Sequence, residues 1–250
     1  MANPIEAQLR SPEIHDTYTP TGRLTREMVT KTTLIAIAIV AAVGAGTWFL
    51  SASAPAIGSL ASLIGAGGLV IITLVQIFSK KMMTNSMGMM TLFAVLEGLM
   101  AGGFSYTAAN YIADKPAGAV VGQALIATVC VVAASAWLYR SGTFVPSAKV
   151  RNIIRVAGWG FFALYAINLV ATLIFGMNFL FAQGPLPIIV GVVAVAIAAV
   201  SIIDTLMTSD ELIAEGAGEE YRFGIATAIM ADVVWMYIEI VRIIALSSRN

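Results

Sequence analysis

The chain contains 250 residues, of which 59% are hydrophobic and 11% are charged, and its formal net charge is zero. Soluble domains carry about 25% charged residues, so this composition excludes an ordinary soluble enzyme and predicts a membrane protein in contact with the lipid bilayer. The 14 basic residues are matched by 14 acidic residues. This balance excludes nucleic acid as a partner, because no basic surface remains to displace the counterions of phosphates.

Residues 1–27 are polar and carry charges of both signs. We expect this first unit of the chain to be a retained cytoplasmic tail, because it is too long and too acidic for the charged region that opens a signal peptide. The only histidine, His15, lies in this tail. A histidine metal cluster is therefore excluded.

The sequence also lacks the motifs of several common chemistries. The single cysteine, Cys130, excludes an intrachain disulfide. No Gly-rich phosphate loop follows a strand pattern, no paired-cysteine motif is present, and no Ser-His-Asp set can form in a membrane domain without histidine. We therefore expect neither enzymatic activity nor a bound cofactor.

Residues 28–250 form the second unit, which contains seven apolar segments. Each segment has about the twenty residues that cross a hydrocarbon core of roughly 30 Å. Backbone polar groups cannot stay unpaired in lipid, and the segments lack the short alternating strands of a barrel, so they must be helices. We therefore predict an all-α, polytopic membrane protein, a compact bundle of seven transmembrane helices at 28–49, 56–78, 87–111, 117–139, 153–175, 187–208 and 222–246.

The distribution of lysine and arginine predicts the orientation of this bundle. Three basic residues, Lys115, Arg242 and Arg249, lie on the side opposite the N-terminal tail. The other eleven lie on the side of the tail. Cytoplasmic loops carry the excess of basic residues, so we expect a cytoplasmic N-terminus and, after seven crossings, an external C-terminus.

Two pairs of glycines recur at four-residue spacing, Gly98 with Gly102 and Gly118 with Gly122. Small residues at this spacing let the backbones of membrane helices approach closely. We interpret both pairs as packing positions of the bundle.

Four carboxylates lie inside the predicted helices: Glu97, Asp204, Asp232 and Glu239. An acid at the middle of a membrane costs roughly 2.5 to 3.5 kcal/mol on insertion scales. Each of the four therefore needs a cationic partner, a proton or water. These residues are the candidate site.

The spacing of the acids predicts their partners. Asp232 and Glu239 are seven residues apart and share one face of a helix, and Arg242 follows Glu239 by three residues, so these two can form an ion pair. Counted from Ala217 in the last turn, Asp204 is 13 residues away, Asp232 is 15 and Glu239 is 22. Depth therefore pairs Asp204 with Asp232, whereas a tilted or staggered last helix would bring Glu239 to Asp204.

Adjacent carboxylates in a low dielectric do not both ionise, so such a pair shares a proton and responds to pH. Three roles fit a shared proton: a proton-linked ion path, a catalytic aspartyl dyad, or a structural hydrogen bond. The dyad resembles presenilin-type intramembrane proteases. The Tyr-Asp and Gly-x-Gly-Asp motifs of that family are replaced here by Ile203-Asp204 and Ala231-Asp232, which argues against protease activity.

The last helix contains Val-Trp-Met-Tyr-Ile-Glu-Ile-Val-Arg at 234–242. This segment resembles the Leu-Trp-Leu-Tyr-Leu-Glu-Ile-Leu-Arg pattern of the Bax-inhibitor family of seven-helix membrane proteins, in its bacterial branch. Shorter matches, in the same order along nearly the whole chain, are Lys31-Thr32, Leu96-Glu97-Gly98, Leu138-Tyr139-Arg140-Ser141-Gly142 and Asn168-Leu169. The resemblance implies a multi-pass protein of the bacterial cytoplasmic membrane.

Characterised members of that family imply a pH-sensitive calcium leak, with an aspartate pair on helices six and seven and a basic residue near the end of helix two. Carried over by position, Asp204 and Glu239 take the two acids, and Lys80 or Lys81 takes the basic position. The second acid is Glu here instead of Asp. The resemblance favours Glu239 as the partner of Asp204, where depth counting favours Asp232.

We therefore expect a pH-sensitive leak for calcium or another cation, gated by a buried carboxylate pair that shares a proton. An ionised acid would hold Lys80 or Lys81 as a latch, and protonation would release it. Calcium prefers oxygen ligands and would be guided transiently near Asp204 and Glu239. The alternative is a non-transporting regulator that binds other membrane proteins and whose acids are structural.

Overall fold

The computed structural model describes residues 22–78, 85–182 and 184–248, and its regular structure over these ranges is helical. The long helices are α2 (Arg26–Ser53), α3 (Pro55–Phe78), α4 (Met87–Thr107), α5 (Ala117–Arg140), α6 (Ala148–Phe175), α7 (Pro185–Ala214) and α8 (Tyr221–Ser247). A π-helical turn, η2 (Ala108–Ile112), continues α4, and a 3-10 turn, η3 (Phe179–Phe181), precedes α7. The predicted all-α fold and its seven helices are confirmed, with ends that differ by a few residues.

Local sequence signals set the ends of these helices. The hydroxyls of Thr25, Ser86 and Ser147 accept hydrogen bonds from the backbone N–H three residues later, as N-caps do. Helix α6 ends at Gly176, whose φ of 65° lies in the left-handed region that glycine adopts without strain. Helix α7 opens with Pro185 in its first turn, where the missing N–H of proline breaks no hydrogen bond.

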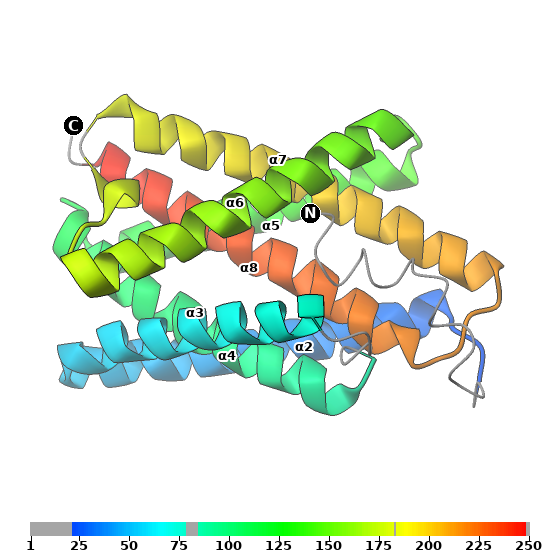
Figure 1. The fold of residues 1–250 in the computed structure, drawn as a ribbon, viewed down its shortest axis with the longest axis horizontal. Helices are drawn as coiled ribbons and strands as arrows, with labels where there is room; N and C mark the ends of the chain where they lie inside the picture. The colour runs from blue at the N-terminus through cyan, green and yellow to red at the C-terminus, as the bar shows by residue number, and fades with distance from the viewer. Residues whose placement is uncertain (1–21, 79–84, 183, 249–250) are drawn as a thin grey trace.

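The seven helices run back and forth along the long axis of the molecule (Figure 1). Six of them, α2 to α7, are long and apolar enough to cross a membrane. Helix α8, the seventh long helix, lies along the same axis as the other six. As a result, α2 begins at one end of the bundle and α8 ends at the other (Figure 1). The chain is a multi-pass membrane protein.

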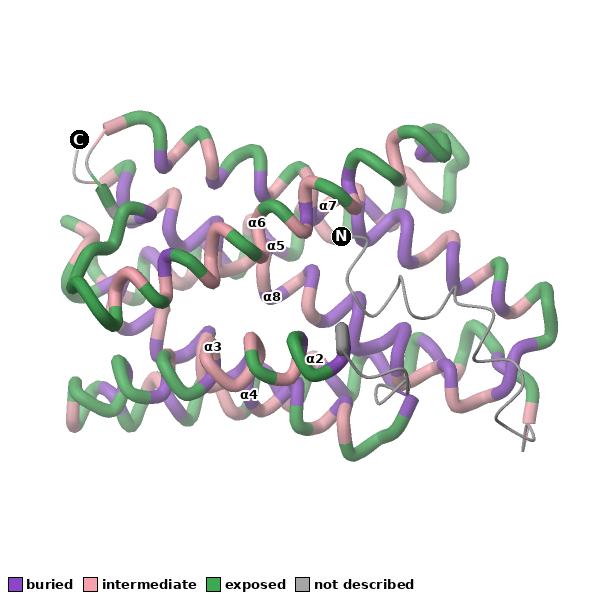
Figure 2. Tube along the Cα trace, viewed as in Figure 1, coloured by how far each residue is buried: buried purple, intermediate pink, exposed green. Residues whose placement is uncertain are grey.

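Helix α8 occupies the centre of the bundle. It packs against α2, α4, α5 and α7, and Figure 2 shows buried residues along its whole length. In contrast, most of α6 is exposed or half-buried (Figure 2). This placement explains how α8 can carry Asp232, Glu239 and Arg242, because the surrounding helices shield these side chains from lipid.

The two glycine pairs behave differently. Gly102 contacts the backbone of Gly44, and a Cβ on Gly98 would lie 3.0 Å from the carbonyl oxygen of Val40, so α2 and α4 meet backbone to backbone. Nothing lies within 4 Å of the position of a Cβ at Gly118 or Gly122. The packing role predicted for this second pair is therefore wrong, since four-residue spacing does not reveal which face of a helix meets a neighbour.

The start of the described chain is bound to the turn between α7 and α8. The N–H of Leu24 donates to the carbonyl of Ala217 at 2.9 Å, and the N–H of Glu219 donates to the carbonyl of Gly22 at 2.9 Å. These bonds fix the entry to α2 beside the ends of α7 and α8. The expected tail ends at residue 27, whereas α2 begins at Arg26, and residues 1–21 lie outside the described ranges.

Candidate functional site

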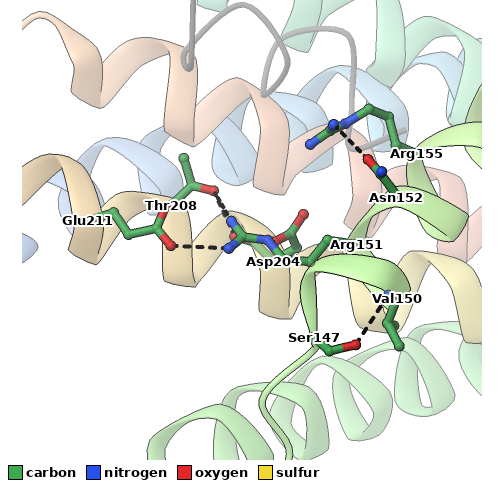
Figure 3. A network of polar contacts seen from close by, with 8 residues as sticks. All are labelled: Ser147, Val150, Arg151, Asn152, Arg155, Asp204, Thr208 and Glu211. Carbon is green, nitrogen blue, oxygen red and sulfur yellow. Dashed lines mark hydrogen bonds and ion pairs between the residues drawn. The ribbon is translucent and has the colours of Figure 1, made fainter.

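Asp204 on α7 is fully buried and forms an ion pair with Arg151 from the first turn of α6. Arg151 also reaches along α7 (Figure 3): its Nη1 lies 3.1 Å from Oε1 of Glu211, and its Nη2 donates to Oγ1 of Thr208 at 3.5 Å. The arginine side chain is only 15% exposed. The guanidinium of Arg151, from α6, therefore lies against Asp204, Thr208 and Glu211 of α7.

This role of Arg151 was not predicted from the sequence, in which Arg151 is one of the eleven basic residues on the side of the N-terminal tail. One signal points to it: an arginine in the first turn of an apolar helix, at the end of the bundle where α7 turns polar. The partner helix cannot be deduced from that signal, because it depends on how α6 leans across α7.

Asp232 on α8 and Glu97 on α4 lie deeper in the bundle, and each side chain is 4% exposed. Ser201 on α7 is hydrogen-bonded to Asp232. Asp232 is close enough to interact electrostatically with both Asp204 and Glu97. Three acids from different helices, Asp204, Asp232 and Glu97, are therefore neighbours inside the bundle, and we call them the acid row.

One oxygen of each deep acid lacks a hydrogen bond. Oε2 of Glu97 and Oδ2 of Asp232 are buried and have no hydrogen-bond partner among the described residues. Buried polar atoms are nearly always satisfied in folded proteins, so an unsatisfied one marks a strained or functional position. Two such atoms at one place make this the candidate site.

Glu239 lies on the same helix as Asp232, two turns further along, and its carboxylate has its own partners. Arg242 forms an ion pair with it from the next turn of α8, and the hydroxyl of Tyr165 on α6 donates to it. The side chains of Glu239 and Arg242 are both almost completely buried. The predicted ion pair between these two residues is confirmed.

Asp204 and Glu239, the pair that the family resemblance favoured, have different partners in the structure. Asp204 pairs with Arg151 and Glu239 with Arg242, and the acid that interacts with Asp204 is Asp232. We therefore correct the preferred partner of Asp204 from Glu239 to Asp232. The reason is depth: α7 and α8 pack against one another on either side of a short turn, and Asp204 and Asp232 lie at similar distances from that turn.

A cavity of about 410 Å³ lies beside this row of acids. Its walls come from α3, α4, α6 and α8, and most of the lining is apolar or aromatic. The charged side chains in the lining are Glu97, Asp232, Glu239 and Arg242. Both deep acids with an unsatisfied oxygen therefore face this space.

Two parts of the expected site have no counterpart here. Lys80 and Lys81, the predicted latch, lie outside the described residues. In the part of the chain that the structure describes, no group of three or more His, Cys, Asp or Glu side chains is placed to hold a metal ion. Transient passage of calcium near Asp204 and Glu239 stays a prediction.

The comparisons with known proteins identify the family. The model of the family described as "Bax inhibitor 1 like" matches residues 3–249, which is nearly the whole chain. No curated protein and no solved structure matches the chain. The family match agrees with the seven-helix bundle and with the motif on α8 that carries Glu239 and Arg242. This chain belongs to the Bax inhibitor 1-like family.

Proposed function

We propose that this protein is a pH-sensitive cation leak of the bacterial cytoplasmic membrane, that calcium is its cargo, and that its N-terminus is cytoplasmic. The observation that carries the proposal is the ion pair between Arg151 and the fully buried Asp204. In this proposal, the ion pair blocks the access of cations to the acid row from the end of the bundle that carries most of the basic residues. In this proposal Arg151 acts as a latch, and the latch expected from Lys80 or Lys81 stays a prediction because both lie outside the described residues.

The latch responds to pH through the charge of Asp204. An ionised Asp204 attracts the guanidinium of Arg151, whereas a protonated Asp204 does not, so that Arg151 then keeps only its contacts with Thr208 and the more exposed Glu211. Asp232 on α8 also interacts electrostatically with Asp204, and in this proposal the two neighbouring carboxylates share a proton. A fall in pH therefore weakens the ion pair between Arg151 and Asp204 and gives cations access to the acid row. The rate of cation leak is expected to rise as the pH falls.

The cargo follows from the ligands that the row offers. The carboxylates of Asp204, Asp232 and Glu97 come from α7, α8 and α4, Glu239 lines the same cavity as Asp232 and Glu97, and hard divalent cations such as calcium prefer oxygen ligands. Among the described residues, no three such acids are placed together to hold a metal ion. Conduction requires such weak, successive sites, because a tight site would retain the ion.

Calcium flux into liposomes that contain the purified protein tests the proposal. Wild-type protein should leak faster at about pH 6 than at about pH 8, the range in which coupled carboxylates titrate. Arg151→Gln should raise the leak at pH 8 to the level that wild type reaches at pH 6. Asp204→Asn should do the same, because asparagine keeps the shape of the side chain but cannot hold Arg151 by charge.

Arg155→Gln is the matched control. Arg155 lies one turn after Arg151 on α6 and is hydrogen-bonded to Asn152 of its own helix (Figure 3). Its replacement should leave both the rate and its pH dependence at the wild-type values. If folded protein gives no flux above that of empty liposomes at any pH, the leak proposal is wrong.

A non-transporting regulator of other membrane proteins is the second candidate. The pairing of Asp204 and Glu239 with arginines favours it, since paired acids can serve stability alone. The unsatisfied oxygens of Glu97 and Asp232 favour the leak instead, because a purely structural network would satisfy them. The flux experiment separates the two candidates.

A further inference from the structure

We infer that the cavity between α3, α4, α6 and α8 is a binding site for a lipophilic organic cation. The inference concerns binding and does not rest on the leak. Four features of the described residues carry it: the size of the cavity, its position, its unbalanced negative charge and its aromatic lining.

The cavity is large enough for a small organic ligand. Its volume of about 410 Å³ falls within the roughly 300 to 1,000 Å³ of small-molecule sites. Two of its walls belong to different parts of the bundle, because α3 packs mainly against α4 and α2, while α6 packs mainly against α7. Both α3 and α6 also expose apolar side chains to lipid, among them Leu63, Ile71, Val156 and Ile167. A ligand for this site must therefore be compatible with the hydrocarbon region.

The charge of the lining favours a cation. Glu239 and Arg242 form an ion pair and so neutralise one another. Glu97 and Asp232 remain, each more than nine-tenths buried and each with one carboxylate oxygen that lacks a hydrogen bond among the described residues. If the two acids share one proton, one negative charge remains in the lining, and a positive group placed between them would compensate it.

The aromatic residues supply faces for the same positive group. Phe161 stacks against Tyr165 with ring centroids 6.2 Å apart and meets Trp235 edge to face at 5.6 Å. All three line the cavity, together with Phe93, Phe104 and Phe162. A cation over an aromatic face is attracted by the negative charge of the ring face, most strongly where water is excluded. Acids and aromatic rings around one apolar space form the kind of site that holds quaternary cations.

Tetraphenylphosphonium and tetraphenylborate are a suitable pair of probes, because they share size and shape and carry opposite charges. Equilibrium dialysis of the full-length protein in detergent should show saturable binding of tetraphenylphosphonium. Tetraphenylborate should bind at least ten times more weakly. Equal binding of the two ions would overturn the inference, since it would mean that apolar surface or Arg242 governs the site. Absence of saturable tetraphenylphosphonium binding would overturn it as well.

Two variants connect the binding to this cavity. Glu97→Gln combined with Asp232→Asn should weaken tetraphenylphosphonium binding at least tenfold, whereas Glu215→Gln, at an exposed acid beyond the end of α7, should leave it unchanged. Ala66→Phe fills the cavity from α3 without changing its charge, and it should also abolish binding. It keeps the test decisive if the double variant fails to fold. Wild-type affinity in folded Ala66→Phe protein would overturn the inference.

The result also separates this inference from the leak. Tetraphenylphosphonium binding without calcium flux would support the cation site and contradict the leak. Calcium flux that responds to pH, together with equal binding of both probe ions, would support the leak and contradict the cation site.

Discussion

Glu239 and Arg242 show how a charged pair is accommodated inside a membrane protein. Both side chains are buried on α8, and the hydroxyl of Tyr165 from α6 gives the carboxylate a second donor. A buried ion pair contributes little net stability, but removal of one partner leaves an uncompensated charge. The pair is therefore expected to be sensitive to single substitutions and tolerant of a double one.

Arg242→Leu should lower the stability of the folded protein by about 3 to 5 kcal/mol, because it leaves the carboxylate of Glu239 buried without a cation. Glu239→Gln together with Arg242→Leu should recover most of that loss, since glutamine can still accept the hydrogen bond of Tyr165. Thermal unfolding in detergent measures both effects. A wild-type unfolding temperature for Arg242→Leu alone would contradict the burial of this pair.

At the residue scale, much of the candidate site could be predicted from the sequence. Acids stand out in apolar segments, so Glu97, Asp204, Asp232 and Glu239 were identifiable, and three-residue spacing identified Arg242 as a partner. Arg151 was not identifiable. Its charge is unremarkable at a helix end, and only the packing of α6 beside α7 turns it toward Asp204.

Among the long helices, α8 carries the most charged residues and is also the most enclosed. Six helices satisfy the length and composition of a membrane span, whereas α8 carries two acids and two arginines within Tyr221–Ser247. Because α2, α4, α5 and α7 surround it, these charges face protein and not lipid. The central position of α8 therefore allows it to carry these charges.

The approach of α4 to α2 gives a prediction for the element scale. Gly102→Ala should lower stability by about 1 to 3 kcal/mol, because the new Cβ would overlap the backbone of Gly44 and force the helices apart. Gly118→Ala on α5 is the matched control, since open space surrounds that position and alanine is the better helix former. Thermal unfolding of the two variants compares them directly. Equal losses for both would show that helix propensity, and not close packing, sets the cost.

The whole molecule has two ends that differ in charge, and this difference predicts its orientation. Glu215 lies at the end of the bundle that carries most of the basic residues, and Met177 lies at the other end. In a Cys130→Ser background, cysteine at 215 should react with an impermeant maleimide only from the cytoplasmic side. Cysteine at 177 should react only from the external side. Labelling of both from one side would contradict seven crossings.

By itself, the sequence determined the membrane environment, the seven helices, the family and the acids inside the bundle. These properties are local, because hydropathy, helix length and short motifs can be read along a single stretch of chain. Only the tertiary structure decided that Asp204 pairs with Arg151 and interacts with Asp232, that α8 lies at the centre, and that Gly102 packs while Gly118 does not. Those outcomes depend on how each helix is rotated about its axis and tilted against its neighbours, and neither angle is encoded in the spacing of residues along one helix.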